Sequence, residues 1–359
     1  MNIFKPRLDK LFIKIKELGV DGFYITNLTN IRYLTGFSGS AASVLITNQD
    51  IHFFSDGRYI VQANEQVKNC NIHITQQLHL VNIKDKKLLA SKKINIAFEA
   101  DHVSFTLYTQ MKKIYPNVHW INTNNLIEEI ASVKDSEELE SLKIAISITD
   151  DVFDAILPEI KEGVTEKYIS SKISYLFKQY GADGDSYESI IASGDRGALP
   201  HARPSEKNFN RGDFIVMDFG ALYNGYHADM TRTVLIGPET EKHKQIYNIV
   251  LEAQLNGIQT AKANVKCASV DIACREIIEK HGYGDFFTHS TGHGIGLEVH
   301  TLPRIHKTND DLLQTNQVIT IEPGIYISGW GGVRIEDDCL IKDTQCIPLN
   351  RTTKELLVI

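Results

Sequence analysis

Four acidic residues in the second half of this chain stand inside or beside strongly apolar runs: Asp218, Asp229, Glu322 and Glu336. Carboxylates buried in apolar strands cost several kcal/mol unless a cation compensates them. Arg334 shares a strand face with Glu336, because strand side chains alternate, but one arginine cannot neutralise four carboxylates. Two divalent cations can do so. The sequence therefore predicts a dinuclear metal centre, completed by the imidazole of His293 in the motif GHGIGLEVH.

A hairpin is expected to bring the two aspartates together. The dipeptide Asn224-Gly225 stands between FIVMDFGAL and ADMTRTVLI, and this dipeptide is typical of a two-residue hairpin turn. Pairing outward from the turn places Asp218 opposite Thr231. Asp218 and Asp229 then become diagonal neighbours on one face, with Cβ atoms roughly 7 Å apart and within reach of a shared ion.

The donor types narrow the choice of metal and of chemistry. Oxygen-rich sites with one imidazole suit Mn²⁺, Co²⁺ or Zn²⁺, and two such ions can assist a hydrolytic displacement. Three further histidines could polarise a carbonyl, stabilise an intermediate or protonate a leaving amine. They are His201, His289 and His300, although for any one of them alone a packed or surface role explains the residue equally well. The glycines of GHGIGLEVH favour a backbone that passes close to a ligand.

The elements that must position these residues fall into two groups. Residues 1–125 predict a small α/β domain that opens with an amphipathic helix, whose apolar stripe is Leu8, Leu11, Phe12, Ile15 and Leu18. Asn48 and Gln49 are expected to turn two of its strands into a hairpin. Strands are expected at 22–26, 43–47, 51–54, 71–75, 94–98 and 118–121, and helices at 58–67 and 104–113.

Residues 126–359 predict a second domain of the α+β class, with helices packed on one face of a curved antiparallel sheet. Ser136 is expected to be the N-cap of its first helix. The strand segments QVITIEPGIYI and GVRIEDDCLI should pair, as should the two segments around Asn224-Gly225. Helices are expected at 136–161, 165–180, 241–262 and 268–281.

Composition excludes several classes of function. The net charge of −7 and the absence of a dense Lys/Arg run give no basis for nucleic-acid binding. No apolar run reaches the 18 or so residues that a membrane span needs. Five cysteines without a CxxC pair argue against a disulfide framework and favour a cytoplasmic protein. GHGIG does not match GxGxxG, and no local signature of a serine or cysteine nucleophile is present.

The ordered motifs VMDFG, HADMTRT, HSTGHGIGLEVH, TIEPGIY and VRIEDD resemble the proline-specific metallopeptidases of the pita-bread fold, in the prolidase and aminopeptidase P branch. GFSGSA and SDGRY, at 36–41 and 55–59, resemble motifs of their creatinase-like N-terminal domain. The resemblance implies five metal ligands, Asp218, Asp229, His293, Glu322 and Glu336, of which Asp229 and Glu336 bridge two ions. It also implies substrate and proton-transfer roles for His201, His289 and His300, and places Arg334 beside the ligands.

The function implied by this resemblance is hydrolysis of the Xaa-Pro bond in short proline-containing peptides. We expect a dipeptidase with two Mn²⁺ ions, Co²⁺ and Zn²⁺ being the alternatives, and a homodimer. The alternative within the branch is an aminopeptidase P that acts on longer peptides. A creatinase-type or non-catalytic member of the fold should lack part of the ligand set, and all five ligands are present. Thr301 and Ala202 depart from the family pattern and affect the shape of the substrate pocket.

Overall fold

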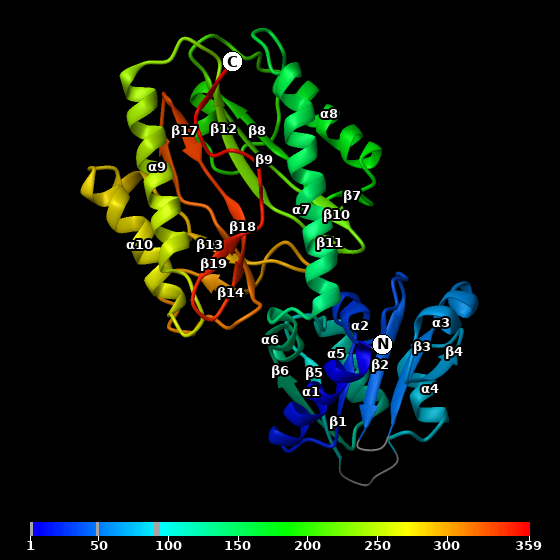
Figure 1. Ribbon diagram of the computed structural model, residues 1–359. Helices are drawn as coiled ribbons and strands as arrows, with labels where there is room; N and C mark the ends of the chain where they lie inside the picture. The colour runs from blue at the N-terminus through cyan, green and yellow to red at the C-terminus, as the bar shows by residue number, and fades with distance from the viewer. Residues whose placement is uncertain (1–2, 48–49, 90–93) are drawn as a thin grey trace. The chain divides into compact units, whose positions relative to one another are not determined.

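The computed structural model describes residues 3–47, 50–89 and 94–359 (Figure 1). The chain divides into two compact units, Met1–Ala131 and Ser132–Ile359. Asn48 and Gln49, the predicted turn residues, lie outside the described residues. Among the described helices, none combines the length and apolar composition that crossing a bilayer requires.

The first unit is built on a six-stranded sheet in the order β4-β3-β2-β1-β5-β6. β1, β2 and β3 pair antiparallel, as the predicted hairpin requires, while β3–β4, β1–β5 and β5–β6 pair parallel. All six predicted strands are present. They are β1 (Gly22–Ile25), β2 (Ala42–Thr47), β3 (Ile51–Ser55), β4 (Asn71–Ile74), β5 (Ile94–Glu99) and β6 (Val118–Thr123).

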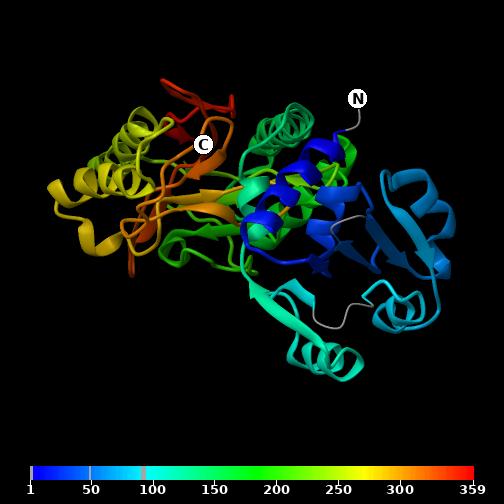
Figure 2. The same ribbon diagram turned by 90° about the horizontal axis from the view of Figure 1, so that it is seen from below.

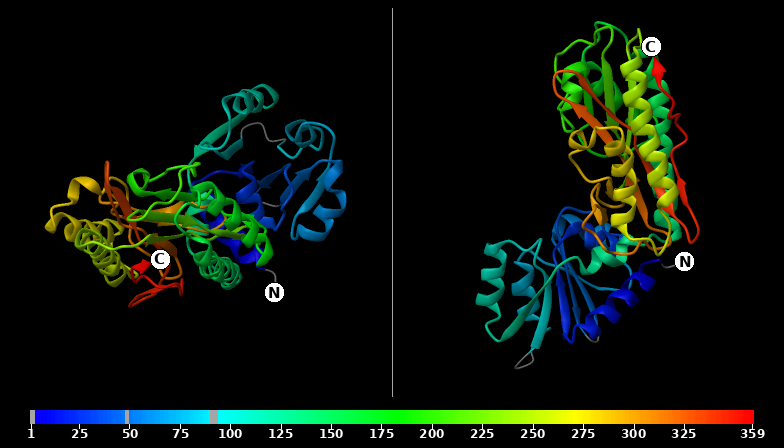
Figure 3. Two further views of the ribbon diagram at one scale, coloured as in Figure 1. Left: turned by 90° about the horizontal axis from the view of Figure 1, so that it is seen from above. Right: turned by 90° about the vertical axis from the view of Figure 1, so that its left-hand side faces the viewer.

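Helices cover both faces of this sheet. α4 and α5 pack on one face through a shared apolar core, and α1 lies on the other (Figure 3). The predicted stripe of α1 is buried at Leu8, Leu11 and Ile15, but Leu18 follows the last helical residue and is 45% exposed. The helices are α1 (Phe4–Glu17), α2 (Leu28–Thr35), η1 (Gly57–Tyr59), α3 (Ile60–Gln66), α4 (His79–Asp85), α5 (Phe105–Ile114) and α6 (Leu126–Ser132).

The second unit contains four sheets, ordered β11-β10-β7, β20-β12-β9-β8, β14-β13-β15-β18-β19 and β16-β17. Both predicted strand pairings are present, because β9 pairs with β12, β15 with β18 and β16 with β17, all antiparallel. Its first strands are β7 (Gly184–Asp185), β8 (Ile190–Ser193), β9 (Phe214–Phe219), β10 (Ala221–Tyr223), β11 (Tyr226–His227) and β12 (Met230–Leu235). The others are β13 (Gly292–Gly294), β14 (Thr301–Ile305), β15 (Val318–Ile321), β16 (Gly324–Ile327), β17 (Gly331–Arg334), β18 (Asp337–Ile341), β19 (Cys346–Pro348) and β20 (Leu357–Val358).

Two helix pairs cover these sheets. α7 and α8 pack on β8, β9 and β12, while α9 and α10 lie against each other and pack on β15 to β18 (Figures 1 and 2). The N-cap of α7 is Asp135, not Ser136 as predicted, because Asp135 and Glu138 form a reciprocal capping box. The helices are α7 (Ser136–Ile156), η2 (Leu157–Glu159), α8 (Glu166–Gln179), η3 (Gly194–Ala198), α9 (Glu241–Thr260), α10 (Cys267–Lys280) and η4 (Gly284–Phe286).

The alternation of strand side chains separates the core from the site. Ile215 and Met217 of β9 belong to the core under α7 and α8, and Asp218 lines a cavity instead. In the same way Val333 and Ile335 join the core under α9 and α10, while Arg334 lines the cavity. The helices therefore stabilise one face of each strand, and the opposite face is left for charged side chains.

Candidate metal centre and its cavity

The hairpin of β9 and β12 positions the first two carboxylates. Asp218 pairs with Thr231, as the sequence predicted. The turn that fixes this register is Asn224-Gly225, whose φ angles are 48° and 75°, and positive φ at both positions is what a type I′ turn requires. Asp229 lies on the same face as Asp218, since one tyrosine hydroxyl contacts both carboxylates.

All nine residues that the sequence nominated for the site line one cavity of about 550 Å³. Strands or the residues next to them supply six: Asp218 is in β9, Asp229 precedes β12, His293 is in β13, Glu322 follows β15, Arg334 ends β17 and Glu336 follows it. Loops supply the other three, His201, His289 and His300. The fold thus brings residues that are up to 135 positions apart in the sequence (201 to 336) into the lining of one cavity.

Three buried residues form the tightest group of potential metal ligands, since donor atoms of Asp229, His293 and Glu336 lie within 4.8 Å of one another. His293 Nε2 is also 3.4 Å from a Glu322 oxygen and 3.7 Å from an Asp229 oxygen. Its Nδ1 donates to the Gly294 carbonyl over 3.1 Å. Burial lowers the pKa of His293 to about 4. The neutral ring therefore directs an electron pair at carboxylate oxygens, an arrangement that a cation between them would stabilise.

Negative charge in the cavity exceeds the positive charge that faces it. Burial, and then repulsion between neighbouring carboxylates, raises the pKa values of Asp229, Glu322 and Glu336 well above their ordinary range. Arg334 forms an ion pair with Asp218. Glu336 Oε1 is buried without a hydrogen-bond partner in the described part of the chain. An unpaired buried carboxylate oxygen among repelling carboxylates fits a site built for cations.

Two family models match this chain along most of its length. Residues 7–133 match the Creatinase/Prolidase N-terminal domain, and residues 140–343 match metallopeptidase family M24. The chain belongs to metallopeptidase family M24. Its fold is the pita-bread fold of that family preceded by a creatinase-like domain, as the sequence predicted.

Relatives of this M24 metallopeptidase match it over their full length. An Xaa-Pro dipeptidase from Pyrococcus furiosus is 36% identical over 358 residues, which cover 98% of this chain and 100% of the relative. A solved Xaa-Pro dipeptidase from Bacillus anthracis is 38% identical with a TM-score of 0.96, covering 99% of this chain and 100% of its own. A solved X-Pro aminopeptidase from Thermotoga maritima is 37% identical with a TM-score of 0.89, covering 98% and 99%.

The M24 family implies divalent metal ions, and the donor set here fits them. Four carboxylates and one neutral imidazole provide hard oxygen donors with a single nitrogen, which is the chemistry that Mn²⁺, Co²⁺ and Zn²⁺ accept. The described residues that line the cavity include no cysteine. The unpartnered oxygen of Glu336 is the strongest single observation, because Glu336 belongs to the tightest ligand group and no group in the described chain satisfies this oxygen.

Arg334 connects the ligands to His289. Its guanidinium donates to Asp218, to Thr231 Oγ1 at 3.0 Å and to the Tyr326 hydroxyl at 2.7 Å. Tyr326 in turn lies 2.8 Å from His289 Nε2, and His289 Nδ1 lies 2.8 Å from a backbone carbonyl. Both ring nitrogens are therefore engaged. Burial, followed by the charge of Arg334, lowers the pKa of His289 to about 3, so the ring is neutral and accepts from Tyr326.

His201 and His300 occupy more open positions on the cavity wall. Both are exposed, and His201 follows η3 on the loop that leads to β9. The His300 ring lies 4.3 Å from the His293 ring, centroid to centroid. Burial and the charge of His201 lower the pKa of His300 below its ordinary value. All three histidines line the cavity, but His201 and His300 are more exposed to it than the half-buried His289.

Tyr187 is a cavity residue that sequence reasoning missed. Its hydroxyl contacts Asp218 and Asp229. Burial, then the charge of Asp218, raises the pKa of Tyr187 well above its ordinary value, so the phenol stays neutral and donates. No local pattern marks it, because it follows a two-residue strand in the segment SYESI. Only its position relative to the two aspartates could have identified it.

The glycines of GHGIGLEVH make room for neighbouring strands. A Cβ atom at Gly292 would lie 2.0 Å from the Thr320 carbonyl oxygen, and one at Gly294 would lie 2.0 Å from the Leu302 carbonyl oxygen. The strand register also shifts between His293 and Gly294. Close strand packing on both sides therefore fixes the direction of the His293 side chain.

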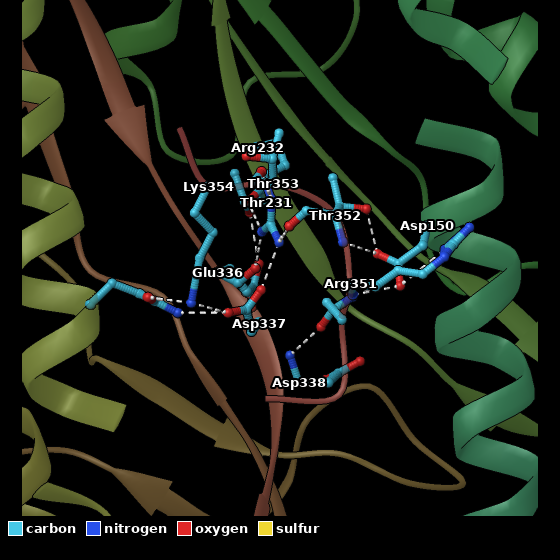
Figure 4. A network of polar contacts seen from close by, with 12 residues as sticks. Asp150, Thr231, Arg232, Glu336, Asp337, Asp338, Arg351, Thr352, Thr353 and Lys354 are labelled. Carbon is cyan, nitrogen blue, oxygen red and sulfur yellow. Dashed lines mark hydrogen bonds and ion pairs between the residues drawn. The ribbon is translucent and has the colours of Figure 1, made fainter. Parts of the chain in front are cut away.

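A second polar network lies behind Glu336 (Figure 4). Arg232 is 1% exposed and donates to the backbone carbonyls of Thr231 and Glu336 and to Asp337 Oδ1, the last over 2.7 Å. Lys354 Nζ donates to Asp337 Oδ2 over 2.8 Å. Asp337 thus forms ion pairs with two cations, whereas Oε1 of its neighbour Glu336 has no partner among the described residues. Because successive side chains of an extended chain point to opposite faces, Glu336 lines the cavity while Asp337 joins the polar network behind it.

Proposed function

We propose that this M24 metallopeptidase is an Xaa-Pro dipeptidase that hydrolyses the peptide bond before proline. The observation that carries the proposal is the cavity in which four carboxylates, one neutral imidazole and one arginine meet, in a chain that matches Xaa-Pro dipeptidases over their full length. Asp218, Asp229, His293, Glu322 and Glu336 would hold two divalent ions, Asp229 and Glu336 being shared. Such ions supply Lewis acidity toward water and the scissile carbonyl.

The remaining side chains of the cavity have separate proposed roles in hydrolysis. Glu322 is half-buried and 3.4 Å from His293, and in this proposal it would carry a proton between water and product. His201 and His300 are exposed in the cavity, which supports proposed roles in donating to the carbonyl oxygen and to the leaving nitrogen. The leaving nitrogen of an Xaa-Pro bond belongs to a tertiary amide and needs a proton to depart. Arg334 holds Asp218, and His289 supports Arg334 through Tyr326.

The second candidate is an Xaa-Pro aminopeptidase acting on longer peptides. The observation in its favour is the 37% identity to the solved X-Pro aminopeptidase from Thermotoga maritima. The two activities differ at the far end of the substrate. A dipeptidase must bind the free carboxylate of proline, whereas an aminopeptidase must admit further residues.

Incubation of the metal-loaded enzyme with an Xaa-Pro dipeptide and with an Xaa-Pro-Yaa tripeptide tests the proposal. We expect cleavage of the dipeptide, with a kcat/KM at least about tenfold above that of the tripeptide. A reversed preference would establish the aminopeptidase. Cleavage of neither peptide, by protein with two bound ions per chain, would contradict both. The control is a Pro-Xaa dipeptide, which should remain intact.

We further propose manganese as the metal, with cobalt or zinc as alternatives, and a homodimer in the cytoplasm. The oxygen-rich donor set supports manganese and is also compatible with the two alternatives. The compartment follows from five cysteines that are all free thiols, and the dimer rests on the family resemblance. Metal analysis of protein purified without added metal tests the first, and sedimentation equilibrium tests the last.

A further inference from the structure

A buried carboxylate outside the metal centre holds both ends of the loop that carries His201. Glu166 is the first residue of α8 and is 0% exposed. Its Oε1 accepts from the backbone N–H and the hydroxyl of Ser193, at 2.8 and 3.0 Å. Its Oε2 accepts from the backbone N–H and the hydroxyl of Ser205, at 3.0 and 2.7 Å. Ser193 and Ser205 flank the segment 194–204, which includes His201.

Arg196 strengthens this arrangement from within the loop. Its Nε lies 3.0 Å from Glu166 Oε2, and its Nη2 donates to the carbonyl of Arg203. The guanidinium therefore offsets the buried charge of Glu166 and also joins the two arms of the loop. Hydrogen bonds to an ionised acceptor are roughly twice as strong as neutral ones. Glu166 thus joins both arms of the loop through hydrogen bonds to a single buried carboxylate.

The opposite side of the same loop rests on β17. A Cβ atom at Gly332 would lie 2.0 Å from the Gly197 carbonyl oxygen, so the loop backbone packs directly on the strand. Arg334 Nη1 lies 3.3 Å from the carbonyl oxygen of Pro200, the residue before His201. Only 194–198 of this loop has regular structure, as η3. The position of His201 therefore depends on contacts at both sides.

We propose that Glu166 is a positioning residue for the hydrolytic reaction, which fixes loop 194–204 so that His201 stays at the cavity wall. Glu166 does not line the cavity and touches neither substrate nor metal ligands. The inference rests on the proposed function, because the role of His201 in Xaa-Pro hydrolysis is part of that function. A displacement of about 1 Å in such a group can cost up to about 100-fold in rate.

The substitution Glu166→Gln tests the proposal while keeping the volume of the side chain. An amide presents one oxygen and one NH₂ group, so one arm of the loop keeps its acceptor and the backbone N–H of the other arm then faces a donor. In metal-loaded enzyme we expect kcat on an Xaa-Pro dipeptide to fall by about tenfold to 100-fold. The bound metal should be unchanged.

A double-substitution cycle separates positioning from a general loss of stability. Glu166→Gln should lower kcat by less than about twofold in the His201→Ala background, because the residue whose position it controls is already absent. An equal loss in both backgrounds overturns the proposal. So does an unchanged kcat in the single variant. We call the contacts of Glu166 with Ser193, Ser205 and Arg196 the clamp. If Glu166→Gln does not fold, Arg196→Met removes the charged partner of Glu166 in the clamp, and its effect on kcat should show the same dependence on His201.

Lys167→Met is the matched control. Lys167 is the next residue of α8 and forms an exposed ion pair, 2.9 Å long, with Glu206 beside the same loop end. Exposed pairs of this kind contribute little, so we expect kcat within about twofold of the unsubstituted enzyme. A loss as large as that of Glu166→Gln would mean that any change at this junction lowers activity, and would overturn the specific role of Glu166.

Hydrogen exchange followed by mass spectrometry reports on the loop without any substrate. Glu166→Gln should raise exchange in 194–204 by at least about fivefold and leave the hairpin 214–235 unchanged. Faster exchange in the variant, together with no Xaa-Pro cleavage by the unsubstituted enzyme, contradicts the proposed function and retains the clamp. Xaa-Pro cleavage by the unsubstituted enzyme, with loop exchange and kcat unaffected by the substitution, retains the function and overturns the clamp.

Discussion

The two oxygens of Glu336 have different surroundings. Oε2 accepts a hydrogen bond from Thr231 Oγ1 at 2.7 Å, whereas Oε1 is buried and has no partner among the described residues. Burial, and then repulsion by Asp229, raises the pKa of Glu336 well above its ordinary value of 4.5. The metal-free enzyme therefore carries a carboxylate that is unfavourable when ionised. The same residue is favourable once a cation is bound.

Glu336→Gln should therefore have opposite effects on function and on metal-free stability. We expect loss of hydrolysis and of bound metal, together with stabilisation of the metal-free protein by at least about 1 kcal/mol at pH 8. The stability that a group with a raised folded pKa contributes is complete below pH 4.5 and is lost as pH rises through the folded value. The variant should thus lose less stability than its parent between pH 5 and pH 8.

Thermal unfolding of both metal-free proteins across that pH range measures the difference. Both proteins contain the same histidines, so the difference between the two pH profiles reports on the substitution at position 336. A metal-free variant that unfolds at a lower temperature than its parent at pH 8 would contradict the charge imbalance inferred here. Retained metal and activity in Glu336→Gln would contradict its role as a ligand.

At this scale the sequence predicted charged residues better than neutral ones. Carboxylates in apolar strands are anomalous, so Asp218 and Glu322 could be singled out without a structure. Tyr187 is chemically unremarkable in sequence, and only the fold brings its hydroxyl to two carboxylates. The sequence also could not show that His289 contacts Tyr326, because the two residues are 37 positions apart and only the fold brings them together.

Among the secondary-structure elements, register was the most predictable feature. A two-residue Asn224-Gly225 turn leaves one pairing for β9 and β12, and the observed pairing of Asp218 with Thr231 is that one. Short helices were predicted unevenly, since the seven-residue α3 lies within the expected helix 58–67, whereas α2 and α4 were not predicted. α2 and α4 have only 8 and 7 residues, too few turns to show an apolar period, and tertiary packing stabilises such helices.

The start of α7 shows which of two neighbouring residues, Asp135 or Ser136, is the N-cap. The sequence alone did not make this distinction. Asp135 Oδ1 accepts from the N–H groups of Glu137 and Glu138, both at 3.0 Å, and Glu138 returns a bond to the Asp135 N–H. Asp135→Ala should therefore lower the free energy of unfolding of the metal-loaded enzyme by about 1 kcal/mol. Ser136→Ala, the matched control, should change it by less than about 0.5 kcal/mol. Urea denaturation measures both, and equal losses would contradict the assigned cap.

In the second unit, residues 351–354 form hydrogen bonds with two helices that pack in different hydrophobic cores. Asp150 of α7 accepts from the N–H groups of Arg351 and Thr352, at 2.9 and 3.2 Å, while Lys354 donates to Gln254 of α9 at 3.1 Å (Figure 4). α7 packs in the core around β9, and α9 packs in the core around β15 to β18. Segment 351–354 is therefore a polar connection between the two halves of the pita-bread unit.

Asp337 is the centre of that connection. It is 1% exposed, and burial alone would raise its pKa, but the charges of Arg232 and Lys354 outweigh burial and lower the pKa below its ordinary value of 3.8. A group with a lowered folded pKa contributes stability above pH 3.8, and that stability is lost as pH falls through the folded value. Ionised Asp337 therefore stabilises the unit at neutral pH as long as both cations remain.

Lys354→Met removes one of the two cations and leaves Asp337 dependent on Arg232. We expect the free energy of unfolding at pH 7 to fall by about 1–3 kcal/mol. The loss should be smaller near pH 3.5, where part of the Asp337 population is neutral in the unfolded chain. Lys244→Met is the control, since Lys244 forms an exposed ion pair with Glu239 at 2.9 Å and should contribute less than about 0.5 kcal/mol.

Hydrogen exchange in the Lys354→Met variant tests whether the connection joins the two halves. If it does, protection should fall both in α7 and in α9, although only α9 carries the Gln254 partner of Lys354. Strands of the first unit have their own core, formed by residues of that unit alone, and should keep their protection. Loss confined to α9 would mean that Lys354 stabilises one helix locally. The two cores would then be joined by Arg232 and the strands rather than by the C-terminal segment.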